Sequence, residues 1–383
     1  MNRKAKRFTL GTLLVLGLLA AWIHVADKDY VYRAAFYNFP DIDDNLIFHQ
    51  REIEAAATPE PWPQSTRYNK LTFPATLEQL HQELESVAFL VIKDDSVVHE
   101  QYWQGYSEES LSNSFSMAKS IISTLVGVAI QEGKIKSVEQ LVGDFLPEYK
   151  EGAKAKIKLR HLLWMSSGLN WDESYSNPLS VTTEAYYGDN LRSIVDRLEA
   201  TEEPGQAFEY KSGDTQLLSF VLEAATGKSV SEYAEEKLWK KIGAERDAEW
   251  SLDRPTGNEK AYCCFFSNAR DFARLGKLYL NNGIWDNDTL VPPAYVRASL
   301  QASMIPKASS GEPTDFYGYQ WWLLPNYKGQ DIFYARGILG QYVVVIPEKN
   351  IIIVRLGEKR GERVGEHPGE LLAMIDAVNE VVK

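Results

Sequence analysis

A serine and a lysine three residues apart are the first side chains in this sequence whose types and spacing suggest covalent chemistry. Ser116 and Lys119 lie in the segment Ser-Met-Ala-Lys, at the start of an apolar stretch with helical spacing. Residues three apart on a helix project from one face, so the hydroxyl and the amine can touch. A serine hydroxyl needs a nearby base to take its proton, and a lysine amine can be that base when burial disfavours its charged form. The spacing predicts Ser116 as nucleophile and Lys119 as its activating amine.

The same four residues are also compatible with an ordinary helix start capped by a serine. A chain of this composition is expected to contain about one Ser-x-x-Lys by chance. The position of the motif favours the catalytic interpretation. It follows two β-rich runs and opens the most apolar predicted helix, within residues 111–135, where a buried charged lysine would be costly.

The elements that must position this pair are strands at both ends of the chain and helices between them. Residues 88–93 and 96–103 predict a β-hairpin about a short turn. Further strands are predicted at 319–323, 331–335, 341–346 and 351–356, and helices at 190–200, 215–226, 269–280 and 371–382. We therefore predict one α+β domain, in which an antiparallel sheet from both chain ends is flanked by helices and a helical subdomain is inserted at approximately 138–280.

The first 26 residues predict a membrane anchor or signal segment. Basic residues at positions 3–7 precede an uncharged apolar run, Phe8–Ala26, which is long enough to cross a bilayer as a helix. Basic residues stay on the cytoplasmic side, so we expect an extracytoplasmic (periplasmic) catalytic domain that is anchored in the inner membrane or secreted. Large residues at the candidate cleavage sites favour the anchor. Residues 27–75 are predicted to be an extended connector, and residues 76–383 the catalytic domain.

Composition and spacing exclude several classes of function. The formal net charge of -12 would repel nucleic-acid phosphates, so no nucleic-acid partner is expected. The six histidines lack metal-ligand spacing, and neither a metal nor another cofactor is predicted. No Gly-x-Ser-x-Gly elbow occurs, which argues against a Ser-His-Asp hydrolase. Cys263 and Cys264 are adjacent, and because neighbouring cysteines rarely bridge without backbone distortion, no disulfide is predicted.

Further segments occur in the order found in the class C β-lactamase-like, penicillin-recognising serine hydrolases. Residues 161–169 resemble the family's helix-to-loop segment beneath the site, in which His161 would be structural. Tyr210 and Ser212 lie where the family has Tyr-x-Asn or Tyr-x-Ser. The resemblance implies a β-lactamase/DD-peptidase-like fold. It also implies that Tyr210 moves a proton between Ser116 and the leaving group, and that Ser212 contacts the substrate.

A third segment near the C-terminus resembles the strand and turn that form the far wall of the family's pocket. The resemblance implies that Gly337 and Ile338 line this wall, and that the backbone N–H groups of Ile338 and Ser116 form an oxyanion hole. True β-lactamases carry Lys-Thr-Gly here, whereas this chain has Ala-Arg-Gly at 335–337. The lysine and hydroxyl that would bind an antibiotic's carboxylate are therefore missing in that order, and efficient lactam turnover is not expected.

The similarity covers most of residues 76–383 and is closest to the 6-aminohexanoate-dimer hydrolase group. That group shares the departure in the third motif and a loop like residues 168–175, which implies that Tyr175 helps to close the site on an amide substrate. We predict a serine hydrolase that cleaves an amide or ester bond of a small substrate through an acyl-enzyme on Ser116. Three alternatives remain: a D-Ala-D-Ala peptidase, in which Arg336 replaces the missing cation, a β-lactamase, and a penicillin-binding-type protein that is acylated without turnover.

Overall fold

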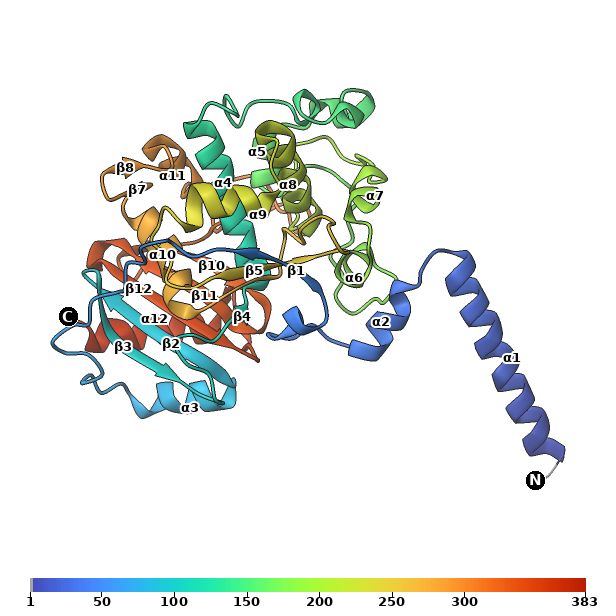
Figure 1. Cartoon of the computed structure of the whole chain (residues 1–383), viewed down its shortest axis with the longest axis horizontal. Helices are drawn as coiled ribbons and strands as arrows, with labels where there is room; N and C mark the ends of the chain where they lie inside the picture. Colours follow the sequence, from blue (N-terminus) through green and yellow to red (C-terminus); the bar gives the residue numbers. More distant parts are fainter. Residues whose placement is uncertain (1–2) are drawn as a thin grey trace.

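The protein, described here by a computed structural model for residues 3–383 (side chains from residue 11), is built around a six-stranded antiparallel sheet (Figure 1). Its strands are β2 Ser86–Lys93, β3 Ser96–Tyr102, β9 Trp322–Tyr327, β10 Gln330–Gly337, β11 Gln341–Ile346 and β12 Ile351–Gly357. Their order in the sheet is β3-β2-β12-β11-β10-β9. The N-terminal strands of this sheet join its C-terminal strands where β2 pairs with β12, with Ile92 opposite Ile352. The predicted α+β fold, with a sheet from both chain ends, is confirmed.

Helices cover both faces of this sheet, so its inner strands are apolar along nearly their whole length. Helix α10 (Ala269–Leu280) packs on one face, and helices α3 (Ala75–Glu83) and α12 (Gly369–Val381) pack on the other. Gly276 lets α10 approach the sheet closely, because a Cβ at this position would lie 3.1 Å from branched side chains of β11 and β12. The inner strands of the sheet are therefore shielded from water by the helices that pack on both of its faces.

The helical region contains the two helices that carry the candidate catalytic residues. Helices α4 (Ala118–Gln131) and α8 (Ser212–Thr226) pack against each other and are largely buried. Helix α8 ends before Gly227, whose φ of 71° is typical of a helix C-terminus. The remaining short elements are α5 Leu159–Leu163, α6 Val181–Tyr187, α7 Leu191–Asp196, α9 Val230–Ala234, α11 Pro293–Ser299, β7 Ile284–Trp285, β8 Asp288–Thr289, β13 Arg363–Val364 and β14 His367–Pro368.

A second, four-stranded sheet joins segments that are far apart in the sequence. Its strands are β1 His49–Ile53, β5 Ala248–Leu252, β6 Phe265–Ser267 and β4 Ser112–Asn113, in that order across the sheet. Strand β1 belongs to residues 27–75, so this segment contributes a paired strand as well as an extended connection. The polar sequence of β1 gave no β-type alternation to detect. It becomes a strand because β5, about 200 residues later, offers it a partner.

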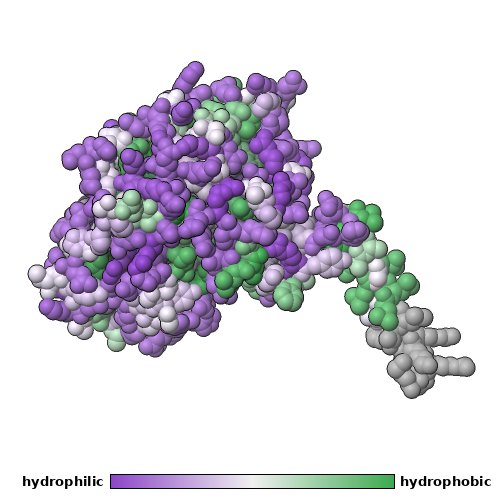
Figure 2. Space-filling model, in the orientation of Figure 1, coloured by the Kyte–Doolittle hydropathy of each residue, from purple (hydrophilic) through white to green (hydrophobic). Residues whose placement is uncertain are grey.

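The N-terminal helix α1 (Arg3–Val25) extends away from the rest of the protein (Figure 1). It is followed by the short helix α2 (Tyr30–Tyr37). From Leu13 on, most apolar side chains of α1 are exposed to solvent, for example Leu13 at 60% and Val25 at 85%, whereas Ile23 is buried (Figure 2). The membrane-spanning segment predicted at Phe8–Ala26 is not supported: within the described residues, no helix has both the length and the apolar character needed to cross a membrane.

The prediction that the chain has no disulfide is wrong. Cys263 and Cys264, adjacent in sequence, are bonded to each other in the buried loop that leads into β6. The backbone distortion that makes such bridges rare is present, because Cys264 has a φ of 64°, in the left-handed region that side chains other than glycine seldom adopt. The surrounding structure therefore holds Cys264 in a backbone conformation that the adjacent positions of the two cysteines in the sequence had made unexpected.

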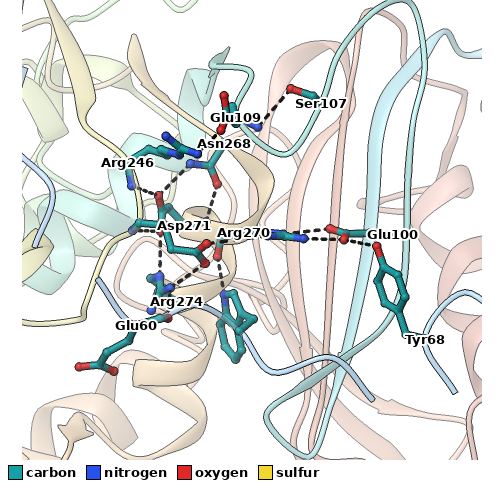
Figure 3. A network of polar contacts seen from close by, with 12 residues as sticks. Glu60, Tyr68, Glu100, Ser107, Glu109, Arg246, Asn268, Arg270, Asp271 and Arg274 are labelled. Carbon is teal, nitrogen blue, oxygen red and sulfur yellow. Dashed lines mark hydrogen bonds and ion pairs between the residues drawn. The ribbon is translucent and has the colours of Figure 1, made fainter. Parts of the chain in front are cut away.

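A buried polar network fastens α10 to the edge of the large sheet (Figure 3). Arg270 on α10 donates two hydrogen bonds to Glu100 on β3, at 3.0 and 2.6 Å, and Tyr68 donates a third at 2.6 Å. On the same helix, Asp271 accepts hydrogen bonds from the side chains of Arg274 and Asn268. Although burial acts to raise the pKa of Glu100, the hydrogen bonds from Arg270 and Tyr68 outweigh it and lower that pKa.

We predict that Arg270→Ala destabilises the protein by about 3–5 kcal/mol at pH 7, because it leaves the Glu100 carboxylate buried and unpaired. The pair's contribution is present above the ordinary glutamate pKa of 4.5 and is lost as the pH falls through the lowered pKa of Glu100. Urea unfolding at pH 7 and pH 4 measures both effects. Arg270→Ala/Glu100→Gln is the matched control and should regain part of the stability. A single variant as stable as the wild type, or a double variant no better than the single, would contradict this.

Candidate active site

The predicted nucleophile and its predicted base are in contact. Ser116 lies in the 3-10 turn η2 (Phe115–Met117), directly before α4, and Lys119 lies in the first turn of α4. Lys119 Nζ is 2.9 Å from Ser116 Oγ, which is hydrogen-bond distance. Lys119 is 1% exposed, whereas Ser116 is only partly buried. The serine can therefore be reached from outside while its amine partner is shielded from water.

Aromatic rings and one backbone carbonyl surround the Lys119 amine. Its Nζ donates a hydrogen bond to the carbonyl oxygen of Tyr262 at 2.9 Å. It also lies 5.0 Å from the ring centre of Tyr210 and 5.7 Å from that of Tyr262. No carboxylate among the residues with described side chains forms an ion pair with Lys119. The amine is thus held by groups that leave it free to exchange a proton with the serine.

The backbone just before the nucleophile is strained. Phe115 has a φ of 43°, a left-handed conformation that costs a bulky residue about 1–3 kcal/mol. Two hydrogen bonds hold this turn: Phe115 N donates to Asn113 Oδ1 at 2.9 Å, and Ser114 N donates to Phe265 O at 2.8 Å. Strained backbone of this kind clusters at catalytic sites, where the surrounding structure fixes it. Here it turns the chain sharply between β4 and α4, with Ser116 in the turn.

Tyr210 lies beside Lys119 in an aromatic cluster. It comes two residues before α8, and its ring packs against Tyr317 and Trp322, with ring centres 6.0 and 5.8 Å away. Arg336 stacks on the same Trp322, with 3.4 Å between the guanidinium carbon and the ring centre. Arg336 also donates a hydrogen bond to the carbonyl oxygen of Glu366. The cation of the altered third motif is therefore already engaged by the protein.

Ser212 and Tyr175, both predicted to contact substrate, are joined by Glu173. Its Oε2 accepts a hydrogen bond from Ser212 N at 2.7 Å, and its Oε1 accepts from Ser212 Oγ at 2.7 Å and from the Tyr175 hydroxyl at 2.6 Å. Burial of that hydroxyl, and then the Glu173 charge, raise the pKa of Tyr175 well above its usual value, although the residue is 49% exposed. Glu173 was not among the site residues predicted from the sequence. Its only signal was a carboxylate two residues before Tyr175.

The third motif lies against the nucleophile turn. Gly337 ends β10, and a Cβ at this position would lie 2.2 Å from the carbonyl oxygen of Ser114 and 3.1 Å from Phe115 Cβ. Only glycine permits this approach. Ile338 begins the following turn, η7 (Ile338–Gly340), and is partly buried against the main core. The end of β10 and the turn that carries Ser116 are therefore neighbours.

His161 does not join this group. Its Nδ1 accepts a hydrogen bond from Lys158 N at 3.2 Å, and burial lowers its pKa to about 4. It therefore stabilises the start of α5 as a neutral ring. Nor do the described residues contain a cluster of three or more His, Cys, Asp or Glu side chains arranged to hold a metal ion.

Comparison with known proteins gives matches over most of the chain. The Beta-lactamase family model matches residues 73–373. The 6-aminohexanoate-dimer hydrolase of Paenarthrobacter ureafaciens is 29% identical over 295 residues, which cover 73% of this chain and 74% of that protein.

Two solved structures show the same fold. One, from Bacillus anthracis, is described as a candidate 6-aminohexanoate-dimer hydrolase; it has a TM-score of 0.75 and 22% identity, over 88% of this chain and 91% of its own. A family VIII carboxylesterase has a TM-score of 0.66 and 17% identity, over 83% of this chain and 98% of its own. The predicted resemblance is confirmed. A match that spans residues 73–373, on a fold of the expected type, shows that this chain belongs to the β-lactamase family.

Proposed function

We propose that this protein is a serine hydrolase that cleaves an amide or ester bond of a small substrate through an acyl-enzyme on Ser116. The observation that carries the proposal is the 2.9 Å contact between Ser116 Oγ and the buried Nζ of Lys119. Membership of a family that contains hydrolases supports the general class. The contact adds a specific nucleophile and a specific base.

In the proposed reaction, Lys119 takes the Ser116 proton as Oγ attacks the substrate carbonyl. Tyr210, next to the amine, passes a proton to the leaving nitrogen or oxygen as its bond to the carbonyl carbon breaks, and the Lys119 ammonium replaces that proton on Tyr210. Water then attacks the acyl carbon, its proton passes along the same groups to Ser116 Oγ as the acyl bond breaks, and the acid is released. The 5.0 Å separation between Lys119 Nζ and the Tyr210 ring centre supports this path, because it places the Tyr210 ring beside the amine.

We further propose that the backbone N–H groups of Ser116 and Ile338 stabilise the negative charge on the carbonyl oxygen in the transition state. The close approach of Gly337 to the nucleophile turn supports this assignment, since Ile338 is the next residue. Losing one such donor typically raises the barrier by a few kcal/mol. Backbone donors do not depend on the side chains at 335 and 336, so the altered motif leaves them available.

The substrate class follows from the third motif. Terminal carboxylates are usually recognised by a fixed cation, but Arg336 is stacked on Trp322 and bonded to the Glu366 carbonyl. This favours linear amides and esters over the alternatives, namely a D-Ala-D-Ala peptidase, a β-lactamase or a penicillin-binding-type protein without turnover. The names of the relatives support amide and ester bonds as the class of bond cleaved, because one is a hydrolase of 6-aminohexanoate dimer, which contains an amide, and another is a carboxylesterase.

We expect the purified protein to hydrolyse a short-chain p-nitrophenyl ester and a linear amide faster than a chromogenic cephalosporin or a D-Ala-D-Ala peptide. A fluorophosphonate should modify Ser116, as located by peptide mass spectrometry, and Ser116→Ala should abolish both labelling and turnover. Ser114→Ala is a matched control, because within the described part of the chain the Ser114 side chain bonds only the neighbouring Phe115 carbonyl. Labelling of another serine would overturn the assignment, and faster turnover of the cephalosporin or peptide would favour an alternative substrate class.

We expect Lys119→Ala and Tyr210→Phe each to lower kcat by about 10²- to 10⁴-fold, the range for lost proton transfer. Circular dichroism should show an unchanged fold in both. Tyr327→Phe is a suitable control, because this substitution also removes one tyrosine hydroxyl. The Tyr327 hydroxyl bonds Asp376 on α12 instead of a site residue. Full activity in either site variant would reject the role assigned to that residue.

We also propose that α1 associates with a membrane and that the catalytic domain is exported. The basic residues before the apolar run, the exposed apolar side chains of α1 and the disulfide, a bond that persists in oxidising compartments, support this location. Protease added to intact bacterial spheroplasts should digest the catalytic domain of the full chain while leaving a cytosolic marker whole. Protection of the domain in intact spheroplasts would contradict export.

A further inference from the structure

We infer that the Cys263–Cys264 disulfide is a positioning element for the candidate catalytic pair. It fixes the backbone from which Tyr262 presents its carbonyl oxygen to Lys119, and so helps to hold the amine beside Ser116. The inference goes beyond the proposed function and rests on it, because it takes Lys119 to be the group that activates Ser116.

The residues on either side of the disulfide contact residues on either side of Ser116. Tyr262, directly before the disulfide, accepts the hydrogen bond from Lys119 Nζ at 2.9 Å, three residues after Ser116. Phe265, directly after the disulfide, accepts a hydrogen bond from Ser114 N at 2.8 Å, two residues before Ser116. The bridged pair therefore sets the distance and direction between two carbonyl groups that hold the chain before Ser116 and the amine after it.

The carbonyl groups of the two cysteines bind β5 instead of the segment around Ser116. The carbonyl oxygen of Cys263 accepts a hydrogen bond from Trp250 Nε1 at 2.9 Å, and that of Cys264 accepts from Ser251 N at 2.9 Å. Both partners belong to β5. Across four consecutive residues, the outer two carbonyls thus bind Lys119 and Ser114, on either side of Ser116, and the inner two bind β5. Few backbone conformations of residues 262–265 allow all four of these hydrogen bonds at once.

The conformation that achieves this is unfavourable for a free cysteine. Cys264 has a φ of 64°, in the left-handed region, where a Cβ is crowded. A bond between neighbouring side chains closes a small ring around the intervening peptide and restricts the rotations that would relax it. Cys263 is 4% exposed and Cys264 is fully buried, so the bridge is shielded from solvent thiols in the folded protein. These properties suit a permanent constraint near a site that tolerates little displacement.

Breaking the bond should therefore affect catalysis more than stability. In reduction by a dithiol, the two sulfurs gain two electrons and two protons to become thiols, and the dithiol becomes a disulfide. Residue 264 can then leave the left-handed region, and the Tyr262 carbonyl loses its fixed position against Lys119. A displacement of about 1 Å at a catalytic group can lower the rate by about 100-fold.

The test compares the oxidised full chain, the same protein reduced with dithiothreitol, and Cys263→Ser/Cys264→Ser. Alkylation under denaturing conditions, followed by mass spectrometry, counts the free thiols in each sample. For each, the rate of fluorophosphonate labelling at Ser116 and the kcat and KM for an ester are measured across pH. The double variant treated with dithiothreitol is the control for effects of the reductant elsewhere, because it has no cysteine left to reduce.

We expect no free thiols in the untreated protein, and a kcat about 10- to 100-fold lower in the reduced protein and in the double variant. KM should change little, the pH dependence of labelling should shift, and reoxidation should restore the reduced protein. A purely structural disulfide would instead lower the unfolding temperature while leaving the pH profile unchanged, and that result would overturn the inference. So would two free thiols in the untreated protein.

Failure of this inference is distinguishable from failure of the proposed function. If the oxidised protein is labelled at Ser116, and the reduced protein is labelled with the same pH dependence, only the positioning role is rejected. If the oxidised protein is not labelled at Ser116, the proposed function itself is rejected. Should the double variant fail to fold, reversible reduction of the wild type decides, and should the buried bond resist reduction, the folded double variant decides.

Discussion

The candidate site depends on one constraint: the Lys119 amine must be shielded from water while it lies within hydrogen-bond distance of Ser116, which remains accessible. Lys119 satisfies it from the first turn of α4, a helix in which every residue from Ala118 to Ala129 is buried. Burying a lysine without a carboxylate partner is costly, so the rest of the fold must offset that cost. The apolar helices and the sheet packed around α4 supply the offset, and the Tyr262 carbonyl and nearby rings supply the contacts.

Three segments far apart in sequence converge on this pair. The strand before Ser116 is held through β6, the wall of the site comes from the end of β10, and Tyr210 and Ser212 come from just before α8 and from its first residue. The first two segments use unusual backbone: no Cβ fits at Gly337, and Phe115 and Cys264 both adopt left-handed conformations. Strain therefore concentrates around the reacting group, while the polar network at Arg270 keeps the helix behind it fixed to the sheet.

Local patterns predicted most of the elements, and the rest depended on contacts between distant residues. The apolar period of α4, the β-rich runs of the large sheet and the three-residue spacing of Ser116 and Lys119 are short-range signals, and the structure contains them all. The pairing of β1 with β5 and the bond of Glu173 to Ser212, 39 residues later, left no trace in either segment alone. The disulfide was missed for a different reason. The unfavourable backbone conformation of Cys264 can be anticipated from the two adjacent cysteines, whereas the hydrogen bonds that hold the surrounding carbonyl groups come from residues distant in the sequence.

The most direct test of the central claim is the rate at which an acyl group transfers to Ser116 in a single turnover. A rapid-quench experiment with a p-nitrophenyl ester, followed by peptide mass spectrometry, measures that rate separately from release of the acid. We expect a transient acyl group on Ser116 in the wild type and a rate of acylation about 10²- to 10⁴-fold lower without the Lys119 amine. Acylation at an undiminished rate in Lys119→Ala, or an acyl group on any other residue, would contradict the central claim.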